Sequence, residues 1–330
     1  MRRVPARVFP GLSSSWAGGL VLAAALAGLV ASDVGSDRLL LLNLVLVYSI
    51  FALGYDLAFG LGGLLSLGHA AMFGLGAYVL ANATLRLGWP FEAALLAAGL
   101  AGMLLAAVMG VVALRLSGIF FALVTLAMGQ LCAILAGNHL RGFTGGLDGL
   151  SGIPRPRLFG IDFSNDRWFL AYNAVVFLLL LVAAARLRAS PFGQVVAGIR
   201  LNAPRIEQLG WRANRFRAAI FAISGFYAGI AGALLASLLF FVSPQVVEWT
   251  TSGDVLIMTV LGGAGTLFGP VLGVAAFELL KDELSRWTDR WYGLLGLIFV
   301  LVTIFAPGGI AGLLGAPARW LSRRRAAAPP

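Results

Sequence analysis

The feature of this sequence that most constrains its fold is a series of apolar runs bounded by charged or turn residues. The hydrocarbon core of a bilayer is about 30 Å thick, and an α-helix of roughly 20 apolar residues crosses it. Because lipid offers the backbone no hydrogen-bond partners, a run of this length satisfies its own N–H and C=O groups only as a helix. With 60% hydrophobic and 12% charged residues, the chain cannot cover the surface of a soluble protein. The sequence therefore predicts an all-α, polytopic integral membrane protein.

The apolar runs predict nine or ten spans. The plain runs lie near 16–31, 39–59, 63–82, 92–114, 118–137, 168–185, 218–242 and 292–314. Between Asp254 and Leu280 the chain is apolar but interrupted by glycines, so this part forms either one broken helix or two short ones. The run 16–31 also fits a cleaved signal peptide, although no small-x-small cleavage site follows it at the expected distance.

The arginines predict how the chain is oriented, because positively charged loops stay on the cytoplasmic side. Of the 24 basic residues, all but Lys281 are arginines, and clusters at 2–7 and 319–325 place both termini in the cytoplasm. The segment 186–217 carries seven arginines and one glutamate, whereas 138–167 carries four arginines and three aspartates. Termini on one side require an even number of crossings. We therefore expect about ten transmembrane helices, with the glycine-rich segment 261–270 separating two short ones.

Composition excludes several other classes of protein. One cysteine (Cys132) and two histidines (His69 and His139) provide neither a disulfide framework nor a metal or His-based catalytic cluster, and no cofactor is expected. The only lysine, Lys281, follows Leu280, so the chain contains no phosphate-binding loop for ATP. The net charge of +10 lies between apolar runs, which indicates a lipid bilayer rather than a nucleic acid as the partner.

Two glycine-rich segments are candidates for a translocation path or a hinge, because small residues let membrane helices pack closely or unwind around a site. They echo each other 200 residues apart, and inverted repeats or chance similarity explain this equally well. The candidate residues are Gly62, Gly63, Ser66 and His69 in the first segment, and Gly262, Gly263, Gly265 and Thr266 in the second.

His69 and Asp56 are polar groups within the apolar runs. Polar side chains at membrane depth are expensive, so each one either faces a water-filled pathway or bonds to a neighbouring helix. For His69 we favour the second interpretation, in which the imidazole only holds the helix packing.

The basic segment 186–217 contains apolar stretches of its own. Ser190-Pro191-Phe192-Gly193 breaks the chain, 194–199 and 205–209 each predict a short helix, and Gly210 ends the second. The segment either docks onto a partner protein or lies as a basic loop near anionic lipid.

The sequence resembles the permease subunits of branched-chain amino acid ABC importers, specifically the M-type member of the two-permease pair. The resemblance extends from about residue 40 to 314 and rests on motifs that occur in the expected order. These motifs are Ser66-Leu67-Gly68-His69 through Gly76-Ala77-Tyr78, Arg115-Leu116-Ser117-Gly118, Thr144-Gly145-Gly146 through Ile153-Pro154, Ser190-Pro191-Phe192-Gly193, Ile199-Arg200, Leu209-Gly210, Leu261 through Thr266, Gly269-Pro270 and Pro307-Gly308-Gly309.

The resemblance implies one transmembrane permease domain over residues 1–330 in the bacterial cytoplasmic (inner) membrane. The implied partners are a second permease subunit in a heterodimer, two separate ATP-binding subunits that hydrolyse ATP, and a periplasmic or extracellular solute-binding protein. The permease itself is then no enzyme. Residues 186–217 form the cytoplasmic coupling loop, and its implied ATPase contacts are Ser190, Phe192, Gly193, Ile199, Arg200, Leu209 and Gly210. The chain departs from the family pattern at Gln194, where arginine is usual, and near Ala203, where an acidic residue is usual.

The sequence leaves alternatives open for the cargo and for the class of transporter. Branched-chain amino acids are the first expectation, while related permeases carry urea, short-chain amides or aromatic acids. An ATP-independent secondary transporter or channel shares the glycine-broken helices, but it is expected to carry paired carboxylates or a proton relay in the membrane, and Asp56 with His69 provides little of either. A membrane enzyme is disfavoured by the shortage of His, Cys and clustered acidic residues.

Overall fold

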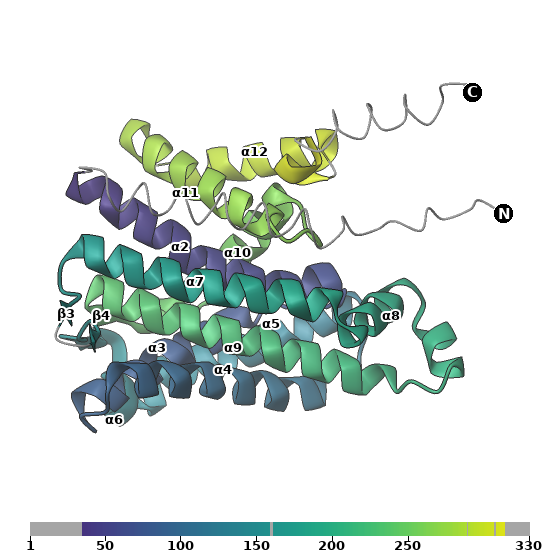
Figure 1. Cartoon of the computed structure of the whole chain (residues 1–330), viewed down its shortest axis with the longest axis horizontal. Helices are drawn as coiled ribbons and strands as arrows, with labels where there is room; N and C mark the ends of the chain where they lie inside the picture. The colour runs from purple at the N-terminus through teal and green to yellow at the C-terminus, as the bar shows by residue number, and fades with distance from the viewer. Residues whose placement is uncertain (1–34, 159–160, 289, 307, 314–330) are drawn as a thin grey trace.

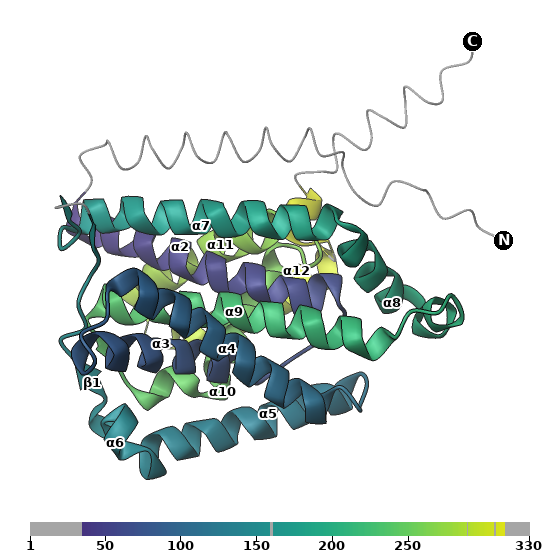
Figure 2. The ribbon, with the colours of Figure 1, turned by 60° about the horizontal axis from the view of Figure 1, so that its bottom comes forward.

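The computed structural model of the protein describes residues 35–158, 161–288, 290–306 and 308–313 (Figure 1). Long helices lie side by side, α8 projects at one end of the bundle, and the short strands and α6 lie at the other end (Figures 1 and 2). The long helices are α2 (Ser36–Asp56), α3 (His69–Leu85), α4 (Phe91–Ala113), α5 (Ile119–Ile134), α7 (Asp166–Ala189), α8 (Pro191–Gln208), α9 (Ala213–Leu239), α10 (Trp249–Gly262), α11 (Gly269–Trp287) and α12 (Trp291–Phe305).

Short elements connect these helices. They are π-helical turns at Leu57–Leu61 and Leu135–His139, α6 (Arg141–Thr144), 3-10 turns at Gly146–Asp148 and Pro244–Val247, and the strands β1 (Leu150–Ser151), β2 (Arg157–Leu158), β3 (Ile161–Asp162) and β4 (Phe241–Val242). β1 pairs antiparallel with β4, and β2 pairs antiparallel with β3. The segments 138–167 and 186–217 thus lie at opposite ends of the bundle, as alternating crossings require.

Within the described residues, 6 segments are long and apolar enough to cross a membrane. They are Asp37–Leu61, Phe91–Ala113, Ile119–His139, Asp166–Ala189, Ala213–Leu239 and Trp291–Leu313. The expected count of about ten is not confirmed. α3 and α10 have 17 and 14 residues, which is short for a full crossing, and α11 carries several charged residues.

Several predicted features fall on particular elements. The expected separation of two helices by 261–270 is correct, since α10 ends at Gly262 and α11 begins at Gly269. The predicted run 63–82 becomes helical only at His69. The run 16–31 and the arginine clusters at both termini lie outside the described residues, so the orientation of the chain stays a prediction.

α2 and α9 form the centre of the bundle and are mostly buried, whereas α5 and α12 expose most of their apolar surface. Small residues permit this packing: a Cβ on Gly76 of α3 would collide with the carbonyl oxygen of Gly229 in α9, and a Cβ on Gly229 would collide with that of Ala98 in α4. Buried amides also join helices, as Asn173 Nδ2 of α7 donates to Asn43 Oδ1 of α2 at 2.8 Å. The large apolar side chains exposed along α4 and α5 are suited to contact with lipid.

The end of the bundle opposite α8 is held by Arg155. Its guanidinium lies between the rings of Phe169 and Phe240, 4.6 and 4.4 Å from their centroids. It donates to Ser164 O at 2.8 Å and pairs with Asp166 at 2.7 Å. This end is therefore fixed by contacts that are independent of α8.

Candidate functional site

The first glycine-rich segment is a break between α2 and α3. After Asp56 the helix loosens into the π-helical turn Leu57–Leu61, and residues 62–68 leave the helical path before α3 begins. Gly63 has φ 71°, a left-handed conformation that glycine adopts without the steric cost of a Cβ. We call residues 57–68 the first break.

Contacts from three other helices fix the end of the first break and the start of α3. Leu67 N donates to Thr125 Oγ1 of α5 at 3.1 Å, and Ala70 N donates to Ser252 Oγ of α10 at 2.8 Å. A Cβ on Gly68 would collide with the carbonyl oxygen of Thr125. The third helix is α9, through His69.

The second glycine-rich segment, residues 263–268, separates α10 from α11, and we call it the second break. Gly263 has φ 116°, and a Cβ there would lie 2.6 Å from Gly308 O. Thr266 Oγ1 donates to Gly263 O at 2.8 Å and accepts from Gly269 N at 3.0 Å, which closes the turn on itself. The second break is therefore shaped mainly by local contacts.

The two breaks meet at a buried ion pair. Asp56, with 0% of its surface exposed, pairs with Arg188 of α7, which is 7% exposed. Asp56 Oδ1 accepts from Gly265 N at 2.7 Å, and Arg188 Nη1 donates to Gly265 O at 3.1 Å. A Cβ on Gly60 would collide with Asp56 Oδ1 and lie 2.5 Å from Gly265 N. We call Asp56, Arg188 and Gly265 the junction.

α8 begins directly after the junction. Ser190 Oγ accepts from Gly193 N at 3.2 Å, and Pro191 occupies the first turn, where its missing N–H costs nothing. A Cβ on Gly193 would lie 2.7 Å from Arg188 O, so the first turn of α8 packs tightly on the end of α7. Phe192 stacks on Phe216 of α9, with ring centroids 5.4 Å apart.

The far part of α8 points away from the bundle (Figures 1 and 2). Asn202 has non-helical φ and ψ, so α8 consists of two helical stretches, as predicted, and Gly210 follows with φ 89°. Ile199 is buried, while Leu201 and Leu209 are 83% and 69% exposed. An apolar tip of this kind is typical of a surface that a partner covers.

Arg200 connects α8 to the first break. Its Nη1 donates to Gly60 O, and a Cβ on Gly63 would lie 2.9 Å from Arg200 Cγ. Arg200, one of the predicted ATPase contacts, thus lies against the predicted hinge residue Gly63. The sequence does not signal this link, because Arg200 and Gly60 lie 140 positions apart.

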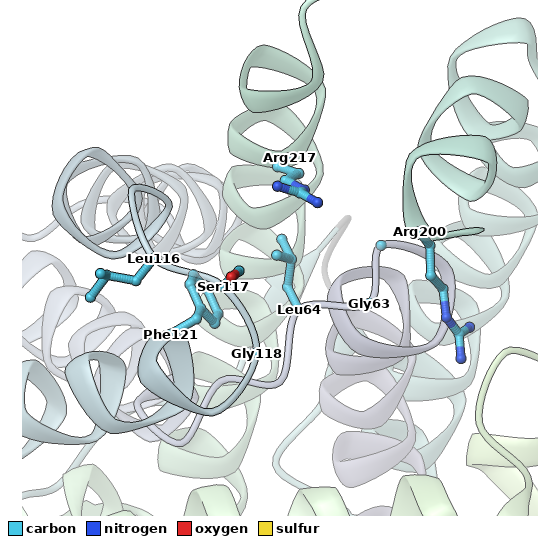
Figure 3. A pocket seen from close by; sticks show the side chains of 9 residues that line it. Gly63, Leu64, Leu116, Ser117, Gly118, Phe121, Arg200 and Arg217 are labelled. Carbon is cyan, nitrogen blue, oxygen red and sulfur yellow. The ribbon is translucent and has the colours of Figure 1, made fainter. Parts of the chain in front are cut away.

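A cavity of about 100 Å³ lies beside the first break (Figure 3). In Figure 3, Arg217 of α9 extends above Leu64, and Arg200 lies on the other side of Gly63. The lining residues are Gly62, Gly63, Leu64, Leu116, Ser117, Gly118, Phe121, Arg200 and Arg217. This small opening is lined by two arginines and no acidic residue, so the predicted hinge residues Gly62 and Gly63 lie in a positively charged environment.

His69 and Ser66 lie away from this cavity. His69 is fully buried, with Nε2 3.0 Å from Ser224 Oγ of α9 and its ring against Tyr55 and Phe221, at 4.9 and 5.5 Å between centroids. Ser66 is also fully buried and accepts from Gly68 N at 3.4 Å. Both lie in the first break or at its end, and their role in a path or a hinge stays a prediction.

Two of the junction residues, Asp56 and Arg188, were not among the predicted site residues, but the sequence did indicate the first of them. Asp56 was recognised as a polar group in an apolar run, and a carboxylate at that depth requires a partner. Arg188, in the last turn of α7, is the partner, but seven arginines lie within 186–217, and the sequence does not show which one turns inward. Gly60 was seen only as one glycine among many.

Comparison with known proteins defines the class of this molecule. The sequence profile of the branched-chain amino acid transport system / permease component family matches residues 38–304, and the chain belongs to that family. It is a multi-pass membrane protein and a permease subunit of the kind found in branched-chain amino acid ABC importers.

Individual members of this family show which permeases the chain is similar to. The chain is 32% identical to the high-affinity branched-chain amino acid transport system permease protein LivM of Escherichia coli K12 over 291 residues, covering 81% of this chain and 68% of LivM. It is 22% identical to LivH of the same organism, covering 80% of this chain and 91% of LivH. The autoinducer 2 import system permease protein LsrC of Yersinia pestis Pestoides F is 29% identical, covering 66% and 63% of the two chains. No solved structure matches the chain significantly.

Proposed function

We propose that this protein is the M-type permease subunit of an ATP-driven ABC importer and forms part of the path by which branched-chain amino acids cross the inner membrane. The observation that carries the proposal is the similarity to LivM, which is higher in identity than the similarity to LivH over a comparable length. The chain then corresponds to one of two unlike permeases, and its partner is a LivH-like subunit.

α8 is the proposed docking element for an ATPase subunit. The segment at its tip, 201–211, exposes Leu201, Leu209 and Trp211, and the exposed residues Arg205, Arg212 and Arg215 lie close to them in the sequence. An apolar centre with a charged rim is the composition of a protein–protein contact, whereas a loop held only by anionic lipid needs charge alone. ATP binding and hydrolysis occur on the two ATPase subunits, and a solute-binding protein delivers cargo at the opposite end of the bundle.

The same docking fixes the proposed orientation. α8 then faces the cytoplasm, and α6 and the short strands face the periplasm, in agreement with the net positive charge of 186–217. Both termini are cytoplasmic in this arrangement. To test this orientation, a cysteine is introduced at Leu201 in a Cys132→Ser background. We expect a membrane-impermeant maleimide to react with it in inside-out vesicles only.

The cargo is the finer part of the proposal. The LsrC relative is an import permease for autoinducer 2, so related chains serve chemically different cargoes. Of two cavities among the described residues, one is small, and the other, about 590 Å³, lies at the Arg155 end, so neither of them identifies one cargo side chain. Selection by the solute-binding protein accounts for this.

Purification of the tagged protein from its own membranes tests the proposal. A second permease and two ATPases are expected to purify with it, and proteoliposomes containing this complex and the loaded binding protein are expected to accumulate leucine, isoleucine and valine only with ATP. Uptake of urea, short-chain amides or aromatic acids instead would correct the cargo. Uptake by the isolated chain without ATP would identify a secondary transporter or channel.

A further inference from the structure

The geometry points to Asp56 and Arg188, assisted by Arg200, as positioning residues that couple α8 to both glycine breaks. This inference rests on the proposed function, in which α8 docks onto an ATPase subunit. It adds the internal connection between that docking site and the part of the membrane domain that moves.

Arg188 is placed to respond to α8. It precedes the N-terminal residue of α8 by three positions, and the tight contact of Gly193 with Arg188 O leaves no gap between the two helices. A shift of the first turn of α8 must therefore shift the Arg188 backbone. The guanidinium at the other end of that side chain contacts α2 through Asp56 and the second break through Gly265.

Arg200 provides a second point of attachment. It lies on α8 itself, and it donates to Gly60 O of the first break. Arg188 and Arg200 thus connect the α7–α8 unit to both breaks at two places. Two attachments fix an orientation as well as a position, so a rotation of α8 is transmitted as well as a translation.

The junction is ionic, although an apolar contact of the same volume would stabilise the fold at least as well. A buried ion pair is seldom better for stability than apolar side chains of the same volume, because removing both charges from water is costly. The pair has one property that an apolar contact lacks: if water enters between the breaks, both charges become hydrated, so the open arrangement is also accessible. This suits an element that must alternate between two states.

The inference also explains why Gly60 has no side chain. The space of its Cβ is occupied by Asp56 Oδ1, with Gly265 N close by. A methyl group there would push the carboxylate away from Arg188 or separate the two breaks.

The test uses the complete complex, reconstituted in proteoliposomes with its second permease, ATPases and binding protein. The key variant is Asp56→Asn combined with Arg188→Gln, which removes both charges and leaves none unpaired. We expect this complex to assemble and to keep its basal ATP hydrolysis within about twofold of the original. Uptake, and the stimulation of hydrolysis by loaded binding protein, are expected to fall about tenfold or more, since coupling energies between sites typically correspond to 5–150-fold effects.

Asp166→Asn is the matched control, because it breaks the Arg155 ion pair at the opposite end of the bundle. Its uptake is expected to stay within about twofold of the original. A double variant with unchanged uptake and unchanged stimulation overturns the inference, and so does a control that is equally uncoupled. If instead the original complex lacks ATP-dependent uptake, it is the proposed function that fails.

If the double variant does not assemble, Arg188→Lys tests the coupling role of Arg188 instead. Lysine keeps the charge and one contact but loses the forked geometry that reaches both Asp56 and Gly265. Uptake about three- to tenfold lower, with basal hydrolysis unchanged, is the expected partial rescue. Uptake equal to that of the original protein overturns the inference.

Discussion

A Leu-Gly-Gly sequence occurs at each of the two glycine breaks, but the breaks are held in different ways. Each has a helix end, a glycine with positive φ at 63 or 263, and a new helix six residues later. The end of the first break and the first turn of α3 are tied through Leu67, His69 and Ala70 to α5, α9 and α10. The second is closed by its own Thr266 and reaches α2 and α7 only through the junction.

From this difference we propose that the second break is the one that moves. A segment whose ends are bonded to several helices opens only if those contacts are lost, and local openings occur where such contacts are few. Among the described residues, the hydrogen bonds of the second break to helices other than α10 and α11 are confined to Gly265, so in this proposal it separates when the junction opens. The first break would then be a fixed support that α8 holds through Arg200.

The largest expected effect comes from removing the contact that the two breaks share. Asp56→Ala leaves the Arg188 guanidinium buried without its counter-charge, and breaking one side of a buried pair typically costs about 3–5 kcal/mol. Denaturant titration in mixed micelles measures this loss in the free energy of unfolding. Asp282→Ala removes an exposed ion pair with Arg286 on α11 and is expected to cost about 0–1 kcal/mol. Equal losses in the two variants would contradict the role of the junction.

His69→Ala tests whether the first break is a support or a path. Loss of a fully buried ring leaves a cavity and removes the bond to Ser224, so the free energy of unfolding is expected to fall by about 2–4 kcal/mol. Because the imidazole is fully buried and bonded to Ser224, we expect it to hold the packing, so uptake per assembled complex is expected to be unchanged. Ser224→Ala keeps the ring but removes its hydrogen bond, together with the bond from Ser224 Oγ to Phe221 O, and is the control for stability. A loss of uptake in stable His69→Ala complexes would place His69 in the path.

Alanine at the two equivalent glycines compares the breaks directly. Gly63→Ala puts a Cβ at a left-handed position that costs about 1–2 kcal/mol, and its close neighbour is a flexible arginine side chain. Gly263→Ala meets a less favourable φ of 116° and the backbone oxygen of Gly308. We expect it to cost about 1 kcal/mol more than Gly63→Ala, measured in the same denaturant titration. The opposite order would mean that the first break is the more constrained one.

The membrane class and most helix positions could be predicted from the sequence, because apolar length and glycine interruptions are local properties. The two helices on either side of 261–270 and the two stretches of α8 followed in this way. The number of spans was not confirmed, since α3 and α10 are short for a full crossing and α11 carries several charged residues. The relation of the two halves as inverted repeats stays a prediction.

The junction could not be predicted, because it depends on contacts between residues 77 to 209 positions apart. Asp56 required a cation, but seven arginines follow within 186–217 and only the fold selects Arg188. In the same way, the sequence placed Ser66 and Thr266 as equivalents. In the structure one is fully buried in the first break, while the other is exposed and closes the second.

Thr266→Ala is expected to have the smallest effect and to sharpen the contrast between the breaks. It removes two hydrogen bonds at an exposed position, so the loss in free energy of unfolding is about 0.5–1.5 kcal/mol. Ser252→Ala, which leaves Ala70 N buried without an acceptor, is expected to cost about 1–3 kcal/mol in the same titration. Because the Thr266 bonds lie within the second break, they persist whether it moves or not, and uptake is expected to be unaffected. A strong loss of uptake from Thr266→Ala alone would mean that the second break changes its internal shape instead of moving as a unit.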